Sequence, residues 1–173
     1  MAEVLVLVEH SDGAVKKVTT ELLTAARALG SPSAVVVGAP GTAAPLAGAL
    51  AAAGADKIYV AESADAENYL VTPFVDVLAG LVESASPAAV LLAATAEGKE
   101  IAGRLAARIG SGILGDVVDV KSDGTAVHSV FGGAYTVEAK VAADTPVITV
   151  RPGAIEPQAS AGAGEQVPVE VPA

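Results

Sequence analysis

The chain opens its first apolar run with VLVLV at residues 4–8, and Glu9 follows directly. An unbroken run of β-branched residues and Leu is typical of a strand buried on both faces, as in a parallel sheet covered by helices. Val15, Val18 and Leu22 then recur at helical spacing, and a glycine stands at position 30. This start predicts a strand followed by a helix, which is half of a β–α–β unit.

The same alternation continues to residue 109. We expect strands at 34–37, 57–61 and 88–94, each followed by a helix, over 42–54, 72–86 and 96–109 respectively. Candidate helix caps are Ser11 or Asp12 for the first helix, Thr42 for the second and Thr72 for the third. Four strand–helix pairs in succession predict an α/β fold, doubly wound, with a mostly parallel sheet between two helical layers.

Beyond Gly115 the apolar period changes from helical to alternating. Short strands are predicted at 117–120, 126–131, 135–141 and 145–150, and we expect them to extend or flank the sheet in antiparallel fashion. From residue 153 the sequence becomes rich in Ala, Gly, Pro, Gln and Glu, a composition that buries little apolar surface. We therefore expect an α/β domain at 1–152 and a linker or extended tail at 153–173, with an edge strand as its most regular structure.

Composition excludes several classes of function. The 173 residues carry 10 Lys and Arg against 20 Asp and Glu, a formal charge of −10, which opposes binding to nucleic acid or to an anionic membrane surface. The absence of Cys excludes disulfides, thiolate metal sites and thiol catalysis. No 18-residue apolar window and no basic leader occur, so we expect neither a membrane span nor a signal peptide, and a cytoplasmic bacterial protein.

Two strand ends carry polar residues that would share one crevice in such a sheet. Glu9 and His10 follow the first strand, and the segment Thr95-Ala-Glu-Gly98 with Lys99 opens a helix after the strand at 88–94. A helix amino terminus at the carboxyl end of a strand favours an anion, so these residues form a candidate anion or adenine pocket. A helix cap and a solvated helix face explain the same residues without a ligand.

The familiar catalytic and cofactor motifs are missing or out of context. The glycines of residues 110–115 have dinucleotide-fingerprint spacing but follow a helix, and the Gly98-Lys99 pair lacks the other residues of a phosphate loop. His10 and His128 have no partner at metal-binding spacing, so no metal site is predicted. Only the adjacent His10, Ser11 and Asp12 would support a hydrolase, and neighbouring side chains on one loop diverge. We predict no catalytic residue.

Four blocks, in order, resemble the alpha subunit of electron transfer flavoproteins. They are VLVLVEH at 4–10, VLLAATAEGKEIAGRLAARI at 90–109, GDVVDV at 115–120, and FGGAY at 131–135 with PVITVRPG at 146–153. The resemblance covers only that family's N-terminal domain. It implies an adenine-nucleotide hydrolase-like, Rossmann-like domain, pseudo-symmetric with the nucleotide-binding domain of the beta subunit.

The resemblance also implies a function. In that family, FAD collects electrons from acyl-CoA and other dehydrogenases, as in fatty acid β-oxidation, and passes them to a membrane quinone oxidoreductase. The alpha subunit's FAD contacts lie in a C-terminal domain marked by a Ser-Gly-Gly-Arg-Gly-type segment, which this sequence lacks. The beta subunit carries AMP. We therefore expect a non-enzymatic domain of an electron carrier that contacts the beta subunit as a heterodimer and binds no FAD by itself.

A second interpretation remains open. The strand-end loops at Glu9 and at Thr95 to Lys99 would also suit an adenine-nucleotide-binding module without redox activity. The resemblance and the absence of catalytic groups favour the subunit-contact domain, and no FAD or AMP contact is transferred to an individual residue of this chain.

Overall fold

A computed structural model describes residues 1–172, and its centre is a seven-stranded parallel sheet. Side by side, its strands are β12 (Glu165–Pro168), β5 (Lys57–Glu62), β4 (Ser31–Gly38), β1 (Glu3–Leu7), β6 (Ala89–Ala93), β11 (Val147–Val150) and β7 (Ile113–Val117). The fold class predicted from the sequence, a doubly wound α/β fold with a mostly parallel sheet, is confirmed.

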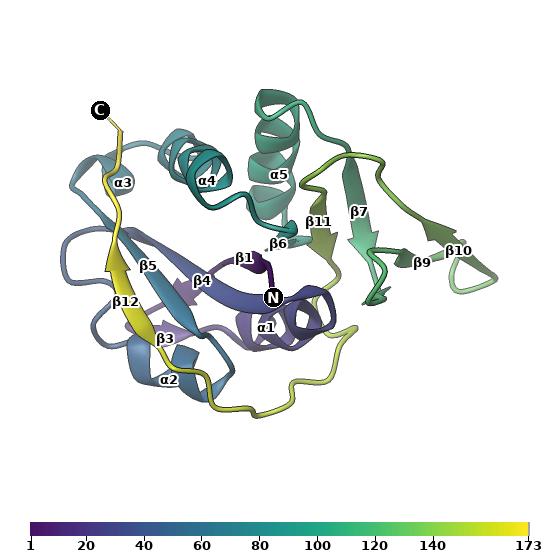
Figure 1. Ribbon diagram of the computed structural model, residues 1–173, viewed down its shortest axis with the longest axis horizontal. Coiled ribbons are helices and arrows are strands. Elements are labelled where there is room, and N and C mark those ends of the chain that lie inside the picture. The colour runs from purple at the N-terminus through teal and green to yellow at the C-terminus, as the bar shows by residue number, and fades with distance from the viewer. Residues whose placement is uncertain (173) are drawn as a thin grey trace.

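Helices cover both faces of this sheet (Figure 1). One layer holds α1 (Lys17–Leu29) and α2 (Ala47–Ala52), and the other holds α3 (Asp65–Asn68), α4 (Thr72–Ala85) and α5 (Ala96–Arg108). Two small antiparallel sheets complete the described chain. They are the hairpin of β2 (His10–Ser11) and β3 (Ala14–Val15), and the three strands β8 (Asp119–Val120), β9 (Ala126–Val130) and β10 (Tyr135–Ala139).

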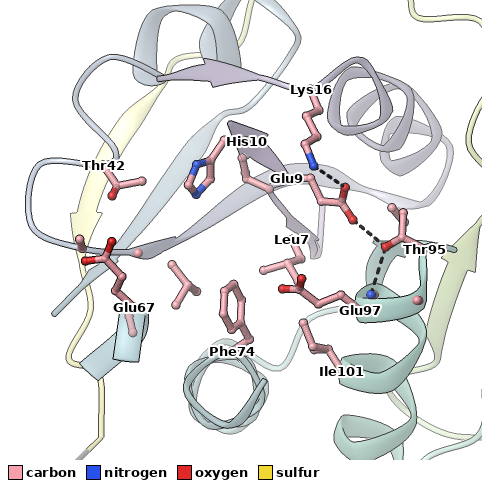
Figure 2. Close-up of a pocket in the computed structure, with 18 residues that line it drawn as sticks. Leu7, Glu9, His10, Lys16, Thr42, Glu67, Phe74, Thr95, Glu97 and Ile101 are labelled. Atoms are coloured by element: carbon pink, nitrogen blue, oxygen red, sulfur yellow. Dashed lines mark hydrogen bonds and ion pairs between the residues drawn. The ribbon is translucent and has the colours of Figure 1, made fainter. Parts of the chain in front are cut away.

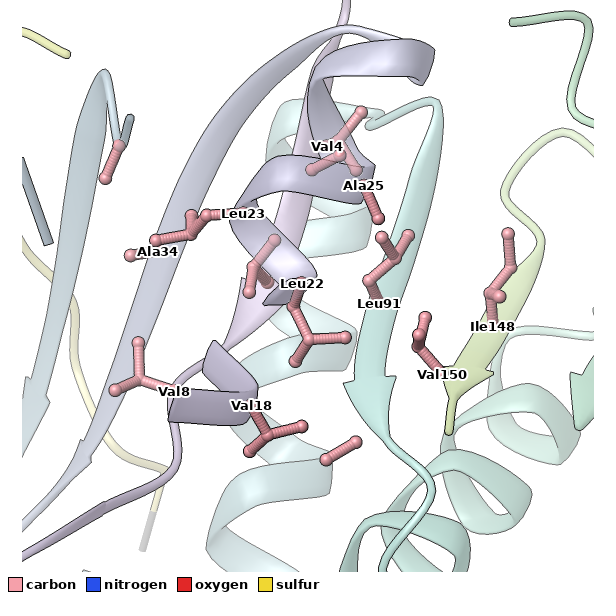
Figure 3. Packing of buried hydrophobic residues seen from close by; sticks show 14 of the residues in the cluster. Val4, Val8, Val18, Leu22, Leu23, Ala25, Ala34, Leu91, Ile148 and Val150 are labelled. Atoms are coloured by element: carbon pink, nitrogen blue, oxygen red, sulfur yellow. The ribbon is translucent and has the colours of Figure 1, made fainter. Parts of the chain in front are cut away.

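The first strand divides the core in two. Val4, Val6 and Val8 face the cluster that contains Leu22 and Leu23 of α1, which Figure 3 shows beside Leu91, Ile148 and Val150. Leu5 and Leu7 face the opposite cluster, which holds the buried residues of α4 and α5. The alternation of side chains along a strand thus sends consecutive residues into different helical layers.

One of the four strands that we expected to be antiparallel, at 145–150, is instead a parallel member of the main sheet, as β11. β11 pairs with β6 on one side and β7 on the other, and all four of its residues are buried. A strand with apolar side chains on both faces buries more apolar surface at the centre of a covered sheet than at its margin, and this burial is stabilising. The other three expected strands correspond to β8, β9 and β10, which do pair antiparallel and lie in the chain between β7 and β11.

The predicted helix caps at Ser11 or Asp12, Thr42 and Thr72 are wrong. Helix α1 begins after Lys16, because Asp12 and Gly13 take positive φ angles of 51° and 73° and form the turn of the β2–β3 hairpin. An Asp-Gly pair is a strong hairpin signal. Helix α2 begins only after Leu46, and α4 after Val71, each without a side-chain cap.

Residues beyond β11 cross the layer of α1 and α2 and then join the sheet as its edge strand (Figure 1). Three residues of α1 hold this segment: Glu21 accepts a hydrogen bond from the Gly153 N–H, Thr24 accepts one from Gln158, and Arg27 donates to the Gln158 carbonyl. The proline-rich tail is therefore fixed along most of its length, and β12 is the edge strand that the alternating valines allow.

A polar cluster ties three strands together near their amino ends. The carboxylate of Glu3 on β1 accepts hydrogen bonds from Ser33 on β4 and from Lys57 and Tyr59 on β5. Partial burial opposes ionisation of Glu3, but these hydrogen bonds and the positive charge of Lys57 outweigh it and lower the pKa of the carboxyl group.

Replacing Glu3 by Gln tests this cluster. A carboxyl group whose pKa is lowered by folding adds stability above its unfolded-state pKa and loses it as the pH falls through the folded-state pKa. We expect Glu3→Gln to lower the free energy of unfolding at pH 7, and the difference from wild type to shrink as the pH falls below about 4.5. Urea unfolding across pH measures this.

Glu100→Gln, which removes an exposed carboxylate of α5, is the control for the loss of one negative charge. A difference between wild type and Glu3→Gln that stayed constant from pH 7 to pH 3 would contradict the role given to the carboxylate.

Candidate functional site

A cavity of about 510 Å³ lies at the carboxyl ends of the central strands, between the two helical layers. In open α/β sheets, ligands bind in this crevice. The inner wall is apolar, with Leu7, Phe74 and Ile101, and the rim is charged (Figure 2). The ionisable side chains in the lining are Glu9, His10, Lys16, Glu67 and Glu97.

Four of the five residues singled out from the sequence line this cavity. Glu9, His10, Thr95 and Gly98 meet there because β1 and β6 are neighbours and end at the same edge. Lys99 is not part of the lining. Its charge acts on Asp116 at the end of β7, where hydrogen bonds from Arg151 chiefly lower the carboxyl pKa and Lys99 adds a smaller effect. Whether the four residues bind a ligand stays a prediction.

A chain of polar contacts spans one side of the cavity. The Thr95 hydroxyl donates to Glu9 Oε1 at 2.8 Å and accepts from the Gly98 N–H at 3.1 Å, so it caps helix α5. The second oxygen of the Glu9 carboxylate lies 3.7 Å from Lys16 Nζ (Figure 2). The helix terminus that would attract an external anion thus already holds a hydroxyl and, behind it, a carboxylate of the protein itself.

Gly98 has a packing role that the sequence did not reveal. A β-carbon at this position would lie 2.0 Å from the carbonyl oxygen of Ala93, far inside van der Waals contact. Only glycine lets the first turn of α5 approach the end of β6 this closely. The glycine of the Gly98-Lys99 pair, which resembles part of a phosphate loop, is therefore explained by the close packing of α5 against the end of β6.

Several lining residues on other elements were missed in the sequence, among them Thr42, Glu67 and Phe74. They lie after β4, in α3 and in α4, and none stands in a recognisable motif. The strand order supplies the missing signal. Since β4 lies beside β1, the loop that follows β4 must reach the same edge as Glu9.

The His10, Ser11 and Asp12 group does not form a catalytic triad. His10 and Ser11 lie consecutively on β2, where they pair with Val15 and Ala14, and Asp12 is in the hairpin turn. Successive side chains of a strand point to opposite faces, so histidine and serine diverge. Across residues 1–172, no three His, Asp or Glu side chains come together as a metal site would require.

No helix within the described residues combines the length and the hydropathy needed to cross a bilayer.

The sequence matches a known protein family and several known proteins. Residues 4–173 match the model of the "Electron transfer flavoprotein domain" family. The chain is 73% identical over its full length to the electron transfer flavoprotein subunit alpha of Mycobacterium tuberculosis, and 70% identical to that of Mycobacterium leprae. A subunit alpha from Syntrophomonas wolfei is 35% identical over 96% of the chain, which is 53% of that relative's length. The chain spans about half the length, 54%, of the two mycobacterial relatives.

Two glycine substitutions in α5 separate packing from helix propensity. Gly98→Ala drives a β-carbon against the Ala93 carbonyl, and we expect a loss of about 1–3 kcal/mol in the free energy of unfolding. Gly103 on the same helix is exposed and has open space around it, so Gly103→Ala should add about 0.5–1 kcal/mol. Chemical denaturation of both variants measures the difference, and a Gly98→Ala protein as stable as wild type would refute the close approach.

Proposed function

The chain belongs to the electron transfer flavoprotein domain family, and we propose that it acts as the N-terminal domain of an alpha subunit that contacts the beta subunit. The observation that carries this proposal is the 70–73% identity along the whole chain to alpha subunits of which the chain spans 54%. In the proposal, the complete protein carries electrons from acyl-CoA and other dehydrogenases to a quinone oxidoreductase, and this domain is a scaffold.

The cavity at the strand ends does not fit the FAD that the family name implies. Its lining brings the carboxylates of Glu9, Glu67 and Glu97 together against one lysine, Lys16. A pyrophosphate would meet repulsion from three carboxylates, and the Gly98 N–H that could bind it already donates to Thr95. We therefore derive no electron-transfer step through these residues, and we propose that FAD binds elsewhere in the complete protein.

Binding to the beta subunit tests the scaffold role. We expect the folded 173-residue chain to form a complex with the purified beta subunit of the same organism in size-exclusion chromatography at micromolar concentration. Thermal unfolding with added FAD should show no stabilisation of the chain alone, because a ligand stabilises only a protein whose native state it binds. Folded chain that fails to form a complex, or a clear rise in Tm with FAD, would overturn the proposal.

A second candidate function is supported by the shape of the same cavity. Its apolar inner wall would suit an adenine base, and its position is that of nucleotide sites in α/β sheets. The phosphate of AMP would then approach the amino terminus of α5, where the Glu9 carboxylate lies. The negative charge of Glu9 would therefore repel the phosphate of a bound adenine nucleotide.

Removing that charge tests the second candidate. If AMP binds in the cavity, Glu9→Gln should strengthen binding on the order of fivefold, the equivalent of about 1 kcal/mol for one solvated charge repulsion. Glu100→Gln, on the exposed face of α5 outside the cavity, should leave the affinity unchanged. Titration calorimetry measures all three proteins, and the absence of heat up to millimolar AMP in each would discard this candidate.

A further inference from the structure

The tripeptide Ser-Asp-Gly occurs twice in the chain, at residues 11–13 and at residues 122–124. The backbone nitrogen of a glycine that follows an aspartate can attack the side-chain carbonyl carbon of that aspartate. Glycine favours this reaction because it has no β-carbon to hinder the approach. Since both copies contain the same reactive groups, a difference in their reactivity must come from the folded structure.

The first copy forms the turn of a very small hairpin. Asp12 and Gly13 are its two central residues, with φ angles of 51° and 73°, and both are exposed. Within residues 1–172, neither the Asp12 carboxylate nor the Gly13 N–H takes part in a hydrogen bond. Strands β2 and β3 have two residues each, and so short a pair of strands opens at little cost. Both reacting groups are therefore free.

The second copy has the same sequence, but its reacting groups are engaged. The two carboxylate oxygens of Asp123 accept hydrogen bonds from the Thr125 N–H and from the Thr125 hydroxyl, each at 3.0 Å. The Gly124 N–H donates to the Lys121 carbonyl at 2.9 Å. The hydrogen bond from the Thr125 N–H also chiefly lowers the pKa of the Asp123 carboxyl group, so less of its protonated form, which loses water more readily, is present.

We propose that Asp12-Gly13 is a site of spontaneous isoaspartate formation in the folded protein, and that the hydrogen bonds of the second copy protect Asp123-Gly124. In the first step, the Gly13 nitrogen forms a bond to Asp12 Cγ, a carbon–oxygen bond of the carboxyl group breaks, and water leaves. In the second step, water adds to the cyclic imide. Where it opens the ring at the α-carbonyl, the backbone afterwards runs through the aspartate side chain.

This modification would alter the rim of the cavity. An isoaspartate adds a carbon atom to the backbone of the turn, so the pairing of β2 with β3 would not be kept. The hairpin leads from His10 to Lys16, which both line the cavity, and the Lys16 N–H donates to the Glu9 carbonyl at 2.9 Å. The main sheet would be unaffected, because β2 and β3 do not belong to it.

Ageing of the purified 173-residue chain at neutral pH and physiological temperature tests the proposal. Trypsin places the two sites in separate peptides, 1–16 and 122–140, and each peptide contains a single aspartate. Isoaspartate in each peptide is measured by chromatography with mass spectrometry, and by methyl transfer from a protein L-isoaspartyl methyltransferase. We expect it to form about tenfold faster at Asp12 than at Asp123, the factor that corresponds to breaking one hydrogen bond to a charged group.

The matched control is the same chain in concentrated urea. There the two Ser-Asp-Gly copies lose their structure, and we expect similar rates at both sites. Asp12→Glu should remove the signal from peptide 1–16, because the larger ring that glutamate would form closes more slowly.

Three results would overturn the proposal. They are equal rates at the two sites of the folded chain, faster formation at Asp123, and a folded chain without isoaspartate in peptide 1–16 under conditions where the chain in urea forms it.

Discussion

Burial of both faces of β1 is the constraint on which the rest of this structure depends. The strand has no polar side chain between Glu3 and Glu9, so neither of its faces can remain in water. Val4, Val6 and Val8 require one helical layer, and Leu5 and Leu7 require another. The parallel pairing of β4 and β6 on either side follows, because helical crossovers in both layers return the chain to the same end of the sheet.

That arrangement brings the loops after β1, β4 and β6 to one edge and creates the cavity there. The chemistry of the cavity is set by the residues that line it, which include the carboxylates of Glu9, Glu67 and Glu97 and a single lysine, Lys16. Thr95 and Glu9 satisfy the amino terminus of α5 from within the protein. The fold thus retains the position of a nucleotide site, while its side chains oppose a polyphosphate.

The opposite edge of the sheet is built differently. Between β7 and β11 the chain leaves the sheet and forms β8, β9 and β10, which contact the core only at their base. The hairpin tip contributes little to the core, and it places an aromatic pair in solvent on a strained backbone. Most of the buried apolar side chains that stabilise the fold therefore lie in the central sheet and the helices that cover it.

Local sequence patterns were sufficient for the helices α1, α2, α4 and α5, for the strands β1, β4, β5 and β6, and for the fold class, since these depend on apolar periodicity and on burial of both strand faces. They also identified Glu9, His10, Thr95 and Gly98, because the carboxyl ends of parallel strands lie at one edge of the sheet, and these residues meet because β1 and β6 are neighbours. Thr42, Glu67 and Phe74 could be found only from the tertiary structure, which places β4 and then β5 beside β1 and packs α3 and α4 near their ends.

The same limit explains the errors. Whether β11 lies inside the sheet or antiparallel at its margin depends on contacts between segments far apart in the chain, with β6 and β7 as neighbours. The packing role of Gly98 depends on its distance from the Ala93 carbonyl oxygen across a turn. Phe131 is exposed because no other part of the described chain covers the end of the β9–β10 hairpin. Periodicity records which residues avoid water, whereas three-dimensional packing decides which other residues they meet.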